Sequence, residues 1–367
     1  MKIKNQFFTA LVGLTMFSAC KKNSEDTLLP PSIKMEIETA AINGRVNEAI
    51  TLKANNTLGG QISQEWLVNT EVKSNTDVLK FTPAKSGLYI IDYKATNSAG
   101  SYTFKYLLSV AAPEIPATTT SNAFVVNFFE YAPAAGQFMN EDGWGNQESG
   151  KAIIGKSVSP GVSLGAFGGY AVYGFDHTVA NQPEKDDIIV YGNAITNLSE
   201  PGVVWVMQDE NGNGKPDDTW YELAGSEFGK EGYVRNYSVT YMRPTPPSLS
   251  VSWKDNQGKT GVVKQTFHRK NHYPLWITAD EFTRTGTLLP STGIKGSVSV
   301  AFTSGYVDNA TGGDKVDIAH AIDKDGKKVV LKGIDFIKVQ TGIMADLTIL
   351  GELSTEVTGI ADISLIK

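Results

Sequence analysis

One short segment concentrates oxygen-bearing side chains at a spacing that suits a metal ion. This segment is 209–218, with the sequence DENGNGKPDD. Asp209, Asn211 and Asn213 occupy alternate positions, and the glycines that follow the two asparagines let the chain curl tightly. Hard cations such as Ca²⁺ take about six to eight oxygen ligands. The spacing therefore lets one loop direct several oxygens at one point.

The segment begins like an EF-hand loop, D-x-N-x-N-G, but departs from that pattern later. Trp220 stands at the twelfth position, where an EF-hand has a bidentate Glu, and Pro216 argues against an exiting helix. We therefore predict a β-hairpin loop stiffened by a structural Ca²⁺. The alternative is a polar hairpin turn without an ion, because Asn-Gly and Asp also favour turns. The predicted ligands are the side chains of Asp209, Asn211, Asn213 and Asp217 and the carbonyl of Lys215, with Asp218 and Glu222 as further candidates.

Aromatic residues are a second candidate for binding chemistry. Five Trp and several Tyr fall after residue 122, and exposed aromatic faces stack on sugars with a large contact area. The alternative is that most of them are core. Trp205 lies inside the apolar run GVVWVM, so we expect it to be buried. Trp220 and Tyr221, which flank the acidic loop, and Trp276, which follows a turn, are the candidate ligand-contacting residues.

The remaining reactive residues give no catalytic pattern. The chain has no second cysteine and no plausible chain order for a catalytic triad, so we predict that it is not an enzyme. His268 and His272 would lie about 13 Å apart on a strand, too far to share an ion, so we expect solvated histidines. Four carboxylates could include an acid/base pair for glycoside hydrolysis, although acidic turn residues are usually solvated. They are Asp186, Asp187, Glu200 and Glu222.

The N-terminus predicts export and a lipid anchor. Two lysines precede an apolar run at 7–17, and small residues lead to Cys20, the order expected of a secretory signal peptide over 1–19. An unpaired cysteine in an exported chain needs an explanation, and this context resembles a bacterial lipobox in which Cys20 is lipidated. The alternative is a plain signal peptide. Residues 20–32 read as a tether, so we expect a lipid-anchored outer-membrane protein.

Two β domains follow, which predicts an all-β fold. Short alternating runs over 33–111, such as GLYIIDYKATN at 87–97, indicate an immunoglobulin-like or PKD-like β-sandwich in which Trp66 packs on aliphatic residues. Residues 112–121 form a Pro/Thr-rich linker. Strand patterns over 122–367 predict one larger β-sandwich of jelly-roll type. The expected strands there are 124–131, 168–175, 187–195, 202–209, 237–244, 297–306 and 334–341.

Several of these segments carry a family resemblance. The runs 163–177, 187–194, 199–214 and 220–227, extended by 237–244, 333–342 and 351–357, resemble the C-terminal domain of Bacteroidetes cell-surface lipoproteins that carry an N-terminal PKD-like module. The resemblance covers most of 120–367. Where the family has a longer Asn- and Asp-rich loop, between Asp308 and Asp317, this chain is short.

The resemblance implies a role in uptake. Such lipoproteins work beside TonB-dependent outer-membrane receptors, often in corrinoid (vitamin B12-type) systems. We therefore expect a surface-exposed lipoprotein that captures a small extracellular ligand, a corrinoid first, for such a receptor. A carbohydrate-binding surface lipoprotein and an adhesion or structural surface protein are the alternatives. The net charge of −6 gives no basic footprint for nucleic acid.

Overall fold

The computed structural model describes residues 28–246, 250–266 and 268–366. The predicted signal peptide and Cys20 lie outside these residues. Within them no helix is long and apolar enough to cross a membrane. Regular structure there consists of β-strands and four short 3-10 helices, so the all-β prediction is confirmed. The 3-10 helices are η1 (Ser149–Ile153), η2 (Ile318–His320), η3 (Thr348–Leu350) and η4 (Ile363–Leu365).

The contacts divide the chain into two compact units. The described part of the first comprises residues 28–42, 50–81 and 89–108. The second comprises Asn43–Ala49, Thr82–Leu88 and the chain from Ser109 onward. Two short segments of the N-terminal half therefore group with the second unit.

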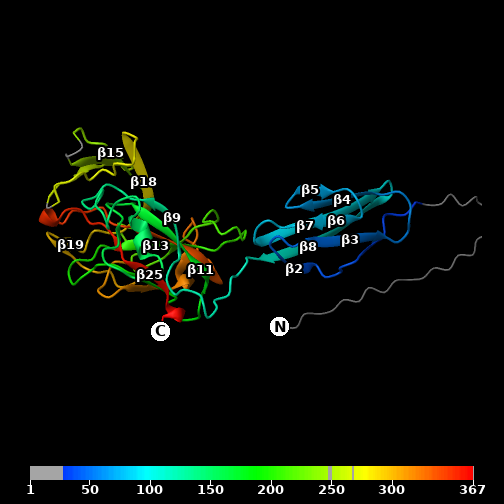
Figure 1. The fold of residues 1–367 in the computed structure, drawn as a ribbon. Helices are drawn as coiled ribbons and strands as arrows, with labels where there is room; N and C mark the ends of the chain where they lie inside the picture. The colour runs from blue at the N-terminus through cyan, green and yellow to red at the C-terminus, as the bar shows by residue number, and fades with distance from the viewer. Residues whose placement is uncertain (1–27, 247–249, 267, 367) are drawn as a thin grey trace, which may run out of the picture. The chain divides into compact units, whose positions relative to one another are not determined.

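The N-terminal strands form two antiparallel sheets, a five-stranded one in the order β2-β8-β7-β4-β5 and a three-stranded one in the order β1-β3-β6 (Figure 1). The strands are β1 (Ile33–Met35), β2 (Ala41–Arg45), β3 (Ile50–Asn56), β4 (Ser63–Val68), β5 (Glu71–Ser74), β6 (Val78–Phe81), β7 (Gly87–Asn97) and β8 (Gly100–Ala111).

Trp66 on β4 is the centre of the first core. Its side chain is fully buried, and its indole N–H donates to the carbonyl of Thr76 at 3.0 Å. Its ring lies 4.6 Å from the Tyr93 ring and 6.4 Å from the Tyr106 ring, centroid to centroid. The prediction of aliphatic partners was therefore wrong in part, because β7 and β8 present tyrosines to this position.

The second unit contains three main sheets and two small ribbons. The sheets have the orders β22-β14-β13-β23-β11-β9, β21-β12-β25 and β17-β16-β15-β18, and the ribbons are β10-β24 and β19-β20. The strands are β9 (Asn127–Ala132), β10 (Val162–Ser163), β11 (Tyr170–Ala180), β12 (Ile188–Tyr191), β13 (Gly202–Met207), β14 (Tyr221–Leu223), β15 (Val234–Met242), β16 (Val251–Asp255), β17 (Thr260–Val263), β18 (Glu281–Leu288), β19 (Ile294–Lys295), β20 (Val298–Ser299), β21 (Asp314–Val316), β22 (Ala321–Ile322), β23 (Gly333–Thr341), β24 (Glu356–Val357) and β25 (Gly359–Asp362).

The main core of this unit fills the space between the six-stranded and the three-stranded sheet. Alternate residues of β13, such as Val204 and Val206, pack with Ile337 of β23 and with Ile188 and Ile360 of the smaller sheet. The four-stranded sheet, whose strands β15 and β18 rise from the rest of the unit in Figure 1, has its own apolar cluster. Two sheets that pack face to face in this way form a β-sandwich, as predicted.

The segment predicted as a strand over 297–306 is mostly loop. Only β20 (Val298–Ser299) is a strand there, and Val298 and Val300 are exposed. The Asn309 side chain accepts a hydrogen bond from the Phe302 N–H at 2.7 Å and donates to the Phe302 carbonyl at 2.9 Å. An asparagine side chain thus takes the backbone groups that a neighbouring strand would have paired.

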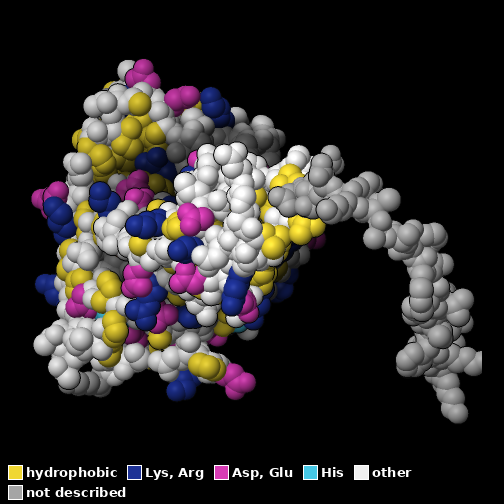
Figure 2. Space-filling view, turned by 90° about the vertical axis from the view of Figure 1, so that its right-hand side faces the viewer, with side chains coloured by type: hydrophobic (Ala, Val, Ile, Leu, Met, Phe, Trp, Pro, Cys, Tyr) yellow, Lys and Arg dark blue, Asp and Glu magenta, His cyan; other side chains and the backbone are white. Residues whose placement is uncertain are grey.

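Charged side chains of both signs are interspersed over the face that Figure 2 shows, without a large area of one sign. This distribution agrees with the modest net charge of −6.

Candidate functional site

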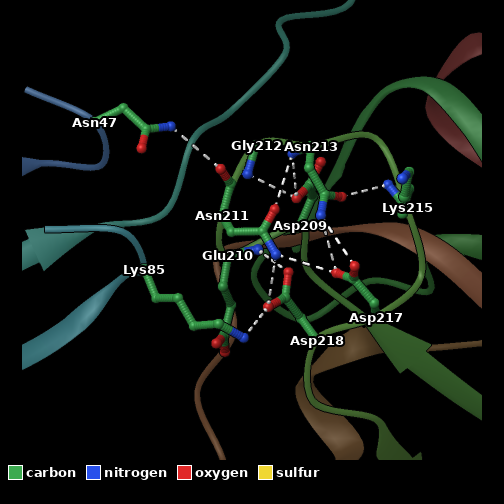
Figure 3. A network of polar contacts seen from close by, with 10 residues as sticks. All are labelled: Asn47, Lys85, Asp209, Glu210, Asn211, Gly212, Asn213, Lys215, Asp217 and Asp218. Carbon is green, nitrogen blue, oxygen red and sulfur yellow. Dashed lines mark hydrogen bonds and ion pairs between the residues drawn. The ribbon is translucent and has the colours of Figure 1, made fainter.

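The acidic loop connects β13 to β14 and is organised around one carboxylate (Figure 3). Asp209 Oδ1 accepts hydrogen bonds from the backbone N–H groups of Gly212 at 2.7 Å and Asn213 at 3.2 Å, and its Oδ2 accepts from Gly214 at 2.8 Å. Both glycines have φ near +70°, a backbone conformation that other residues rarely adopt. The tight curl expected from the sequence is therefore present.

The other predicted ligands form the rest of the network. The amides of Asn211 and Asn213 both donate to Asp217 Oδ1, each at 3.1 Å. These amide donors lower the pKa of the Asp217 carboxyl. The Lys215 carbonyl accepts the backbone N–H of Asp217 at 2.9 Å. The side-chain amides of Asn211 and Asn213 therefore point their N–H groups at Asp217, whereas a cation at that place would need their oxygens.

Asp218 ends the loop and forms an ion pair with Lys85, which belongs to the same unit. Its Oδ2 accepts the Glu210 N–H at 2.9 Å, and its Oδ1 lies 2.7 Å from Lys85 Nζ (Figure 3). Asn47 Nδ2 donates to the Asn211 carbonyl at 3.4 Å. The further candidate ligand Glu222 is engaged elsewhere.

Glu222 is buried on β14 and points away from the loop network. Thr287 Oγ1 donates to its Oε2 at 2.6 Å, the Tyr233 hydroxyl donates to its Oε1, and Arg235 Nε lies 3.5 Å from Oε2. Burial raises the pKa of Glu222 despite these partners. The residue therefore belongs to a structural network.

The aromatic candidates have three different environments, and all are half-buried. The ring of Trp220 lies 4.8 Å from Lys338 Nζ, Tyr221 packs against the main core, and the ring of Trp276 lies 6.0 Å from that of Tyr131. Trp205, expected to be buried, is half-buried and faces the same lysine at 4.8 Å. None of these residues lines the cavity described below.

A second group of acidic residues lies at the other end of β13 and comes from three separate segments. Glu200 precedes β13, Asp308 follows the bridge between Gly202 and Val307, and Glu356 begins β24. One carboxylate oxygen from each lies within 4.8 Å of the others. Asp308 and Glu356 are almost fully buried, and Glu200 is half-buried. We call these three residues the carboxylate centre.

Backbone N–H groups fix the position of Asp308. Its Oδ1 accepts from Asn193 at 2.8 Å and Ala194 at 2.9 Å, and its Oδ2 accepts from Glu356 at 2.8 Å. A Cβ on Gly192 would lie 2.1 Å from Asp308 Oδ1, so only glycine fits where the chain wraps this carboxylate. Asp308 itself has φ +53°, in the left-handed region that Asp tolerates better than most residues.

The other two carboxylates are held by the segment 354–356. The Ser354 N–H donates to Glu200 Oε1 at 3.3 Å, and the Ser354 hydroxyl donates to Glu356 Oε1. Glu356 Oε2 is buried and has no hydrogen-bond partner. Burial and the negative charge of Glu356 hold the pKa values of Glu200 and Asp308 well above their usual range.

A cavity of about 350 Å³ lies against this centre. Glu200, Glu352 and Gln137 give it polar walls, and Phe138 and Leu198 are among its apolar walls. The remaining lining residues are Asn193, Ile195, His268, Leu347 and Leu350.

Glu352 is the most unusual group of the cavity wall. It is 4% exposed, and its Oε1 accepts the Gln137 N–H at 2.6 Å. Its Oε2 has no hydrogen-bond partner, and burial raises the pKa of the carboxyl to about 8. A buried polar atom without a partner costs about 1–3 kcal/mol, so a partner from outside would be favourable.

One wall of the cavity is aromatic. The Phe138 ring lies 5.4 Å from the Trp144 ring and 4.8 Å from the His268 ring. His272 is fully buried, contrary to the expectation of a solvated side chain, and its Nε2 lies 2.9 Å from the His268 carbonyl. Burial lowers the pKa of His272, which favours the neutral ring.

Sequence reasoning considered only Glu200 of these acidic residues. Asp308, Glu352 and Glu356 gave no local signal, because no spacing rule joins positions from three distant segments. Glu352 and Glu356 are four residues apart in an irregular stretch with one short strand, where that spacing predicts no shared face.

No family model matches the chain, and no curated protein matches it. Three similar solved structures are a quinonprotein alcohol dehydrogenase-like protein from Bacteroides thetaiotaomicron (11% identity, TM-score 0.25, covering 66% of this chain and 63% of that one), fibronectin(III)-like modules of CbhA from Clostridium thermocellum (12%, 0.20, 63% and 89%) and a SusE-like protein (7%, 0.17, 91% and 98%). The chain spans less than two thirds of the first of these. At such TM-scores the likenesses carry no argument about function.

Proposed function

We propose that the second unit is a non-enzymatic binding module that captures a small hydroxyl-bearing ligand, a sugar residue, in the cavity beside the carboxylate centre. The observation that carries this proposal is Glu352, a buried side chain on the cavity wall with one oxygen unpartnered. A ligand hydroxyl would supply the missing partner.

The chemistry of the walls suits a sugar. With a pKa of about 8, the Glu352 carboxyl is mostly protonated at pH 7, so it can both donate and accept a hydrogen bond, as sugar hydroxyls do. Gln137 and Asn193 add amide groups, and Phe138 offers an apolar face for the C–H side of a sugar ring. A cavity of about 350 Å³ is at the small end of the usual range for ligand sites.

A corrinoid fits this cavity less well than a sugar residue does. A corrin ring with its amide side chains is much larger than a space of about 350 Å³, so only a peripheral amide would enter. The family resemblance implies corrinoid capture, so cyanocobalamin is the comparison ligand in the experiment.

The proposal is for binding without catalysis. Glycoside hydrolysis needs two carboxyl groups that both reach the substrate. Asp308 is 0% and Glu356 1% exposed, and backbone N–H groups occupy both oxygens of Asp308. Glu200 and Glu352 are the two acidic groups that line the cavity, and burial raises the pKa of both. Neither therefore supplies the ionised carboxylate that hydrolysis pairs with its acid.

The test is calorimetric titration of the full chain with a panel of mono- and disaccharides and with cyanocobalamin. We expect saturable binding of at least one sugar, weakened at least about tenfold by Glu352→Ala and by Phe138→Ala, since about 1.4 kcal/mol corresponds to tenfold in affinity. Glu352→Gln, which keeps a donor and an acceptor, should retain most of the affinity. Glu231→Gln, a change at an exposed carboxylate, is the matched control.

Three outcomes contradict the proposal. Sugar binding that survives Glu352→Ala unchanged would place the ligand elsewhere, with Trp220, Tyr221 and Trp276 as the next residues to substitute. Binding of cyanocobalamin alone would replace the sugar by a corrinoid. Heats that stay flat for every ligand would favour an adhesion or structural role.

We further propose that the chain is lipidated at Cys20, is carried at the outer-membrane surface and passes its ligand to a TonB-dependent receptor. The apolar run followed by Ser-Ala-Cys supports this proposal. Metabolic labelling with a palmitate analogue should mark the wild-type chain and not the Cys20→Ser variant. Protease added to intact cells should remove the chain if it faces the medium.

We also propose a structural Ca²⁺ in the acidic loop. Turning the amides of Asn211 and Asn213 about their terminal bonds would present two oxygens where N–H groups now meet Asp217. Together with Asp209 and Asp217 this gives an all-oxygen donor set, which is what Ca²⁺ prefers.

A further inference from the structure

We infer that Glu200, Asp308 and Glu356 bind a second divalent cation, Ca²⁺ in preference to a softer metal, at the base of the cavity. One oxygen of each carboxylate lies within 4.8 Å of the others, a spacing that one ion can bridge. All three donors are oxygens, the ligands of a hard cation, and no Cys or His belongs to the group. This site is separate from the acidic loop and does not depend on the proposed sugar binding.

A second observation points to a missing ligand. Glu356 is 1% exposed, and its Oε2 has no hydrogen-bond partner. Among the residues that the structure describes, no ion pair involves Glu200, Asp308 or Glu356. Buried carboxylates gathered without a positive partner must be neutralised, either by protons or by a cation.

The surroundings are built to hold these side chains in place. Three backbone N–H groups fix Asp308, and the backbone and hydroxyl of Ser354 fix Glu200 and Glu356. Carboxylate oxygens that are positioned by such donors keep further lone pairs free for a metal. Glu200 also lines the cavity, so water or a ligand could complete the coordination from that side.

The experiment counts bound Ca²⁺ on the metal-depleted full chain by equilibrium dialysis and elemental analysis. Asp209→Asn, which disables the acidic loop, isolates the second site. We expect the Asp209→Asn chain to bind one Ca²⁺ at pH 7.5, and the further change Glu356→Gln to weaken that binding at least about tenfold. Glu231→Gln in the same background is the matched control and should leave it unchanged.

A second measurement covers the case in which Glu356→Gln fails to fold. Because the metal must displace protons from carboxyl groups of raised pKa, Ca²⁺ binding to the Asp209→Asn chain should release protons and should tighten as the pH rises, a trend to be followed from pH 6 to pH 8. Calorimetry in two buffers of different ionisation enthalpy measures that release. Absence of Ca²⁺ binding over this range, or Ca²⁺ binding that Glu356→Gln leaves unchanged in a folded chain, would overturn the inference and leave protons as the neutralising charge.

Discussion

At the scale of single residues, Lys338 is a lysine whose ammonium group lies among aromatic rings and largely out of water. It lies on β23, and its Nζ is 4.8 Å from the ring centroids of Trp205 and Trp220 and 5.6 Å from that of Tyr170. The rings stabilise a cation, but burial lowers the pKa of Lys338 to about 8 despite the negative charges of Glu130 and Glu222. Desolvation therefore outweighs the attraction.

This balance predicts a pH dependence. Between about pH 8 and the unfolded pKa of 10.5 the unfolded chain binds a proton at Lys338 that the native chain does not, so stability rises with pH over this window. We compare the free energy of unfolding of the wild type with that of Lys338→Met. The difference, wild type minus variant, should increase by at most about 3 kcal/mol from pH 7 to pH 10, since one pKa unit is about 1.4 kcal/mol. Denaturant titrations at the two pH values measure it. Parallel pH profiles for the two proteins would contradict the shift.

At the scale of elements, substitutions at Asp209 distinguish a Ca²⁺-binding loop from a polar turn without an ion. Asp209 accepts three backbone N–H groups, so Asp209→Ala should destabilise the chain by about 1–3 kcal/mol with or without an ion. Asp209→Asn keeps an acceptor but removes the charge. If the loop binds Ca²⁺, the Asn variant should melt like the wild type in chelator and gain less than the wild type when Ca²⁺ is added. Equal gains in both proteins would identify a plain turn.

The loop that wraps Asp308 gives a second prediction at this scale. Gly192→Ala places a Cβ about 2.1 Å from Asp308 Oδ1, and three backbone N–H groups hold that carboxylate in place, so it cannot easily move aside. We expect a loss of stability of several kcal/mol, on the order of the 3–5 kcal/mol seen when buried polar networks are broken. Gly293→Ala, at a position that like Gly192 has no positive φ and where the nearest atom to an added Cβ lies at 3.2 Å, is the matched control for the substitution itself. Thermal melting compares them, and equal melting temperatures would contradict the packing described.

The same two loops show what sequence could and could not predict. The acidic loop is contiguous, so its residue types and their spacing are enough to predict a tight, oxygen-rich turn. The carboxylate centre joins positions 200, 308 and 356, and the contacts that unite them are backbone N–H groups and a left-handed φ at Asp308 that no residue pattern encodes. Strand alternation predicted most of the sandwich, yet it mistook 297–306 for a strand, because it cannot foresee that the Asn309 side chain will pair with Phe302.

At the scale of the whole molecule, each unit has an apolar core of its own, which predicts two separable unfolding transitions. The first core is centred on Trp66, and the second contains Ile337 between two sheets. Trp66→Ala should lower the midpoint of one transition, because truncating a fully buried Trp costs about 3–5 kcal/mol. Ile337→Ala should lower the other, with a cost of about 2–5 kcal/mol.

The response to Ca²⁺ is an independent way to tell which transition belongs to the second unit. Both cation sites belong to the second unit, so added Ca²⁺ should raise the midpoint that Ile337→Ala lowers and leave the other unmoved. Differential scanning calorimetry of the full chain and of the two variants, each with Ca²⁺ and with chelator, measures these shifts. A single transition that both substitutions and Ca²⁺ shift together would mean that the two cores unfold as one cooperative body, and the Trp66 unit would then share in the stability that the ions provide.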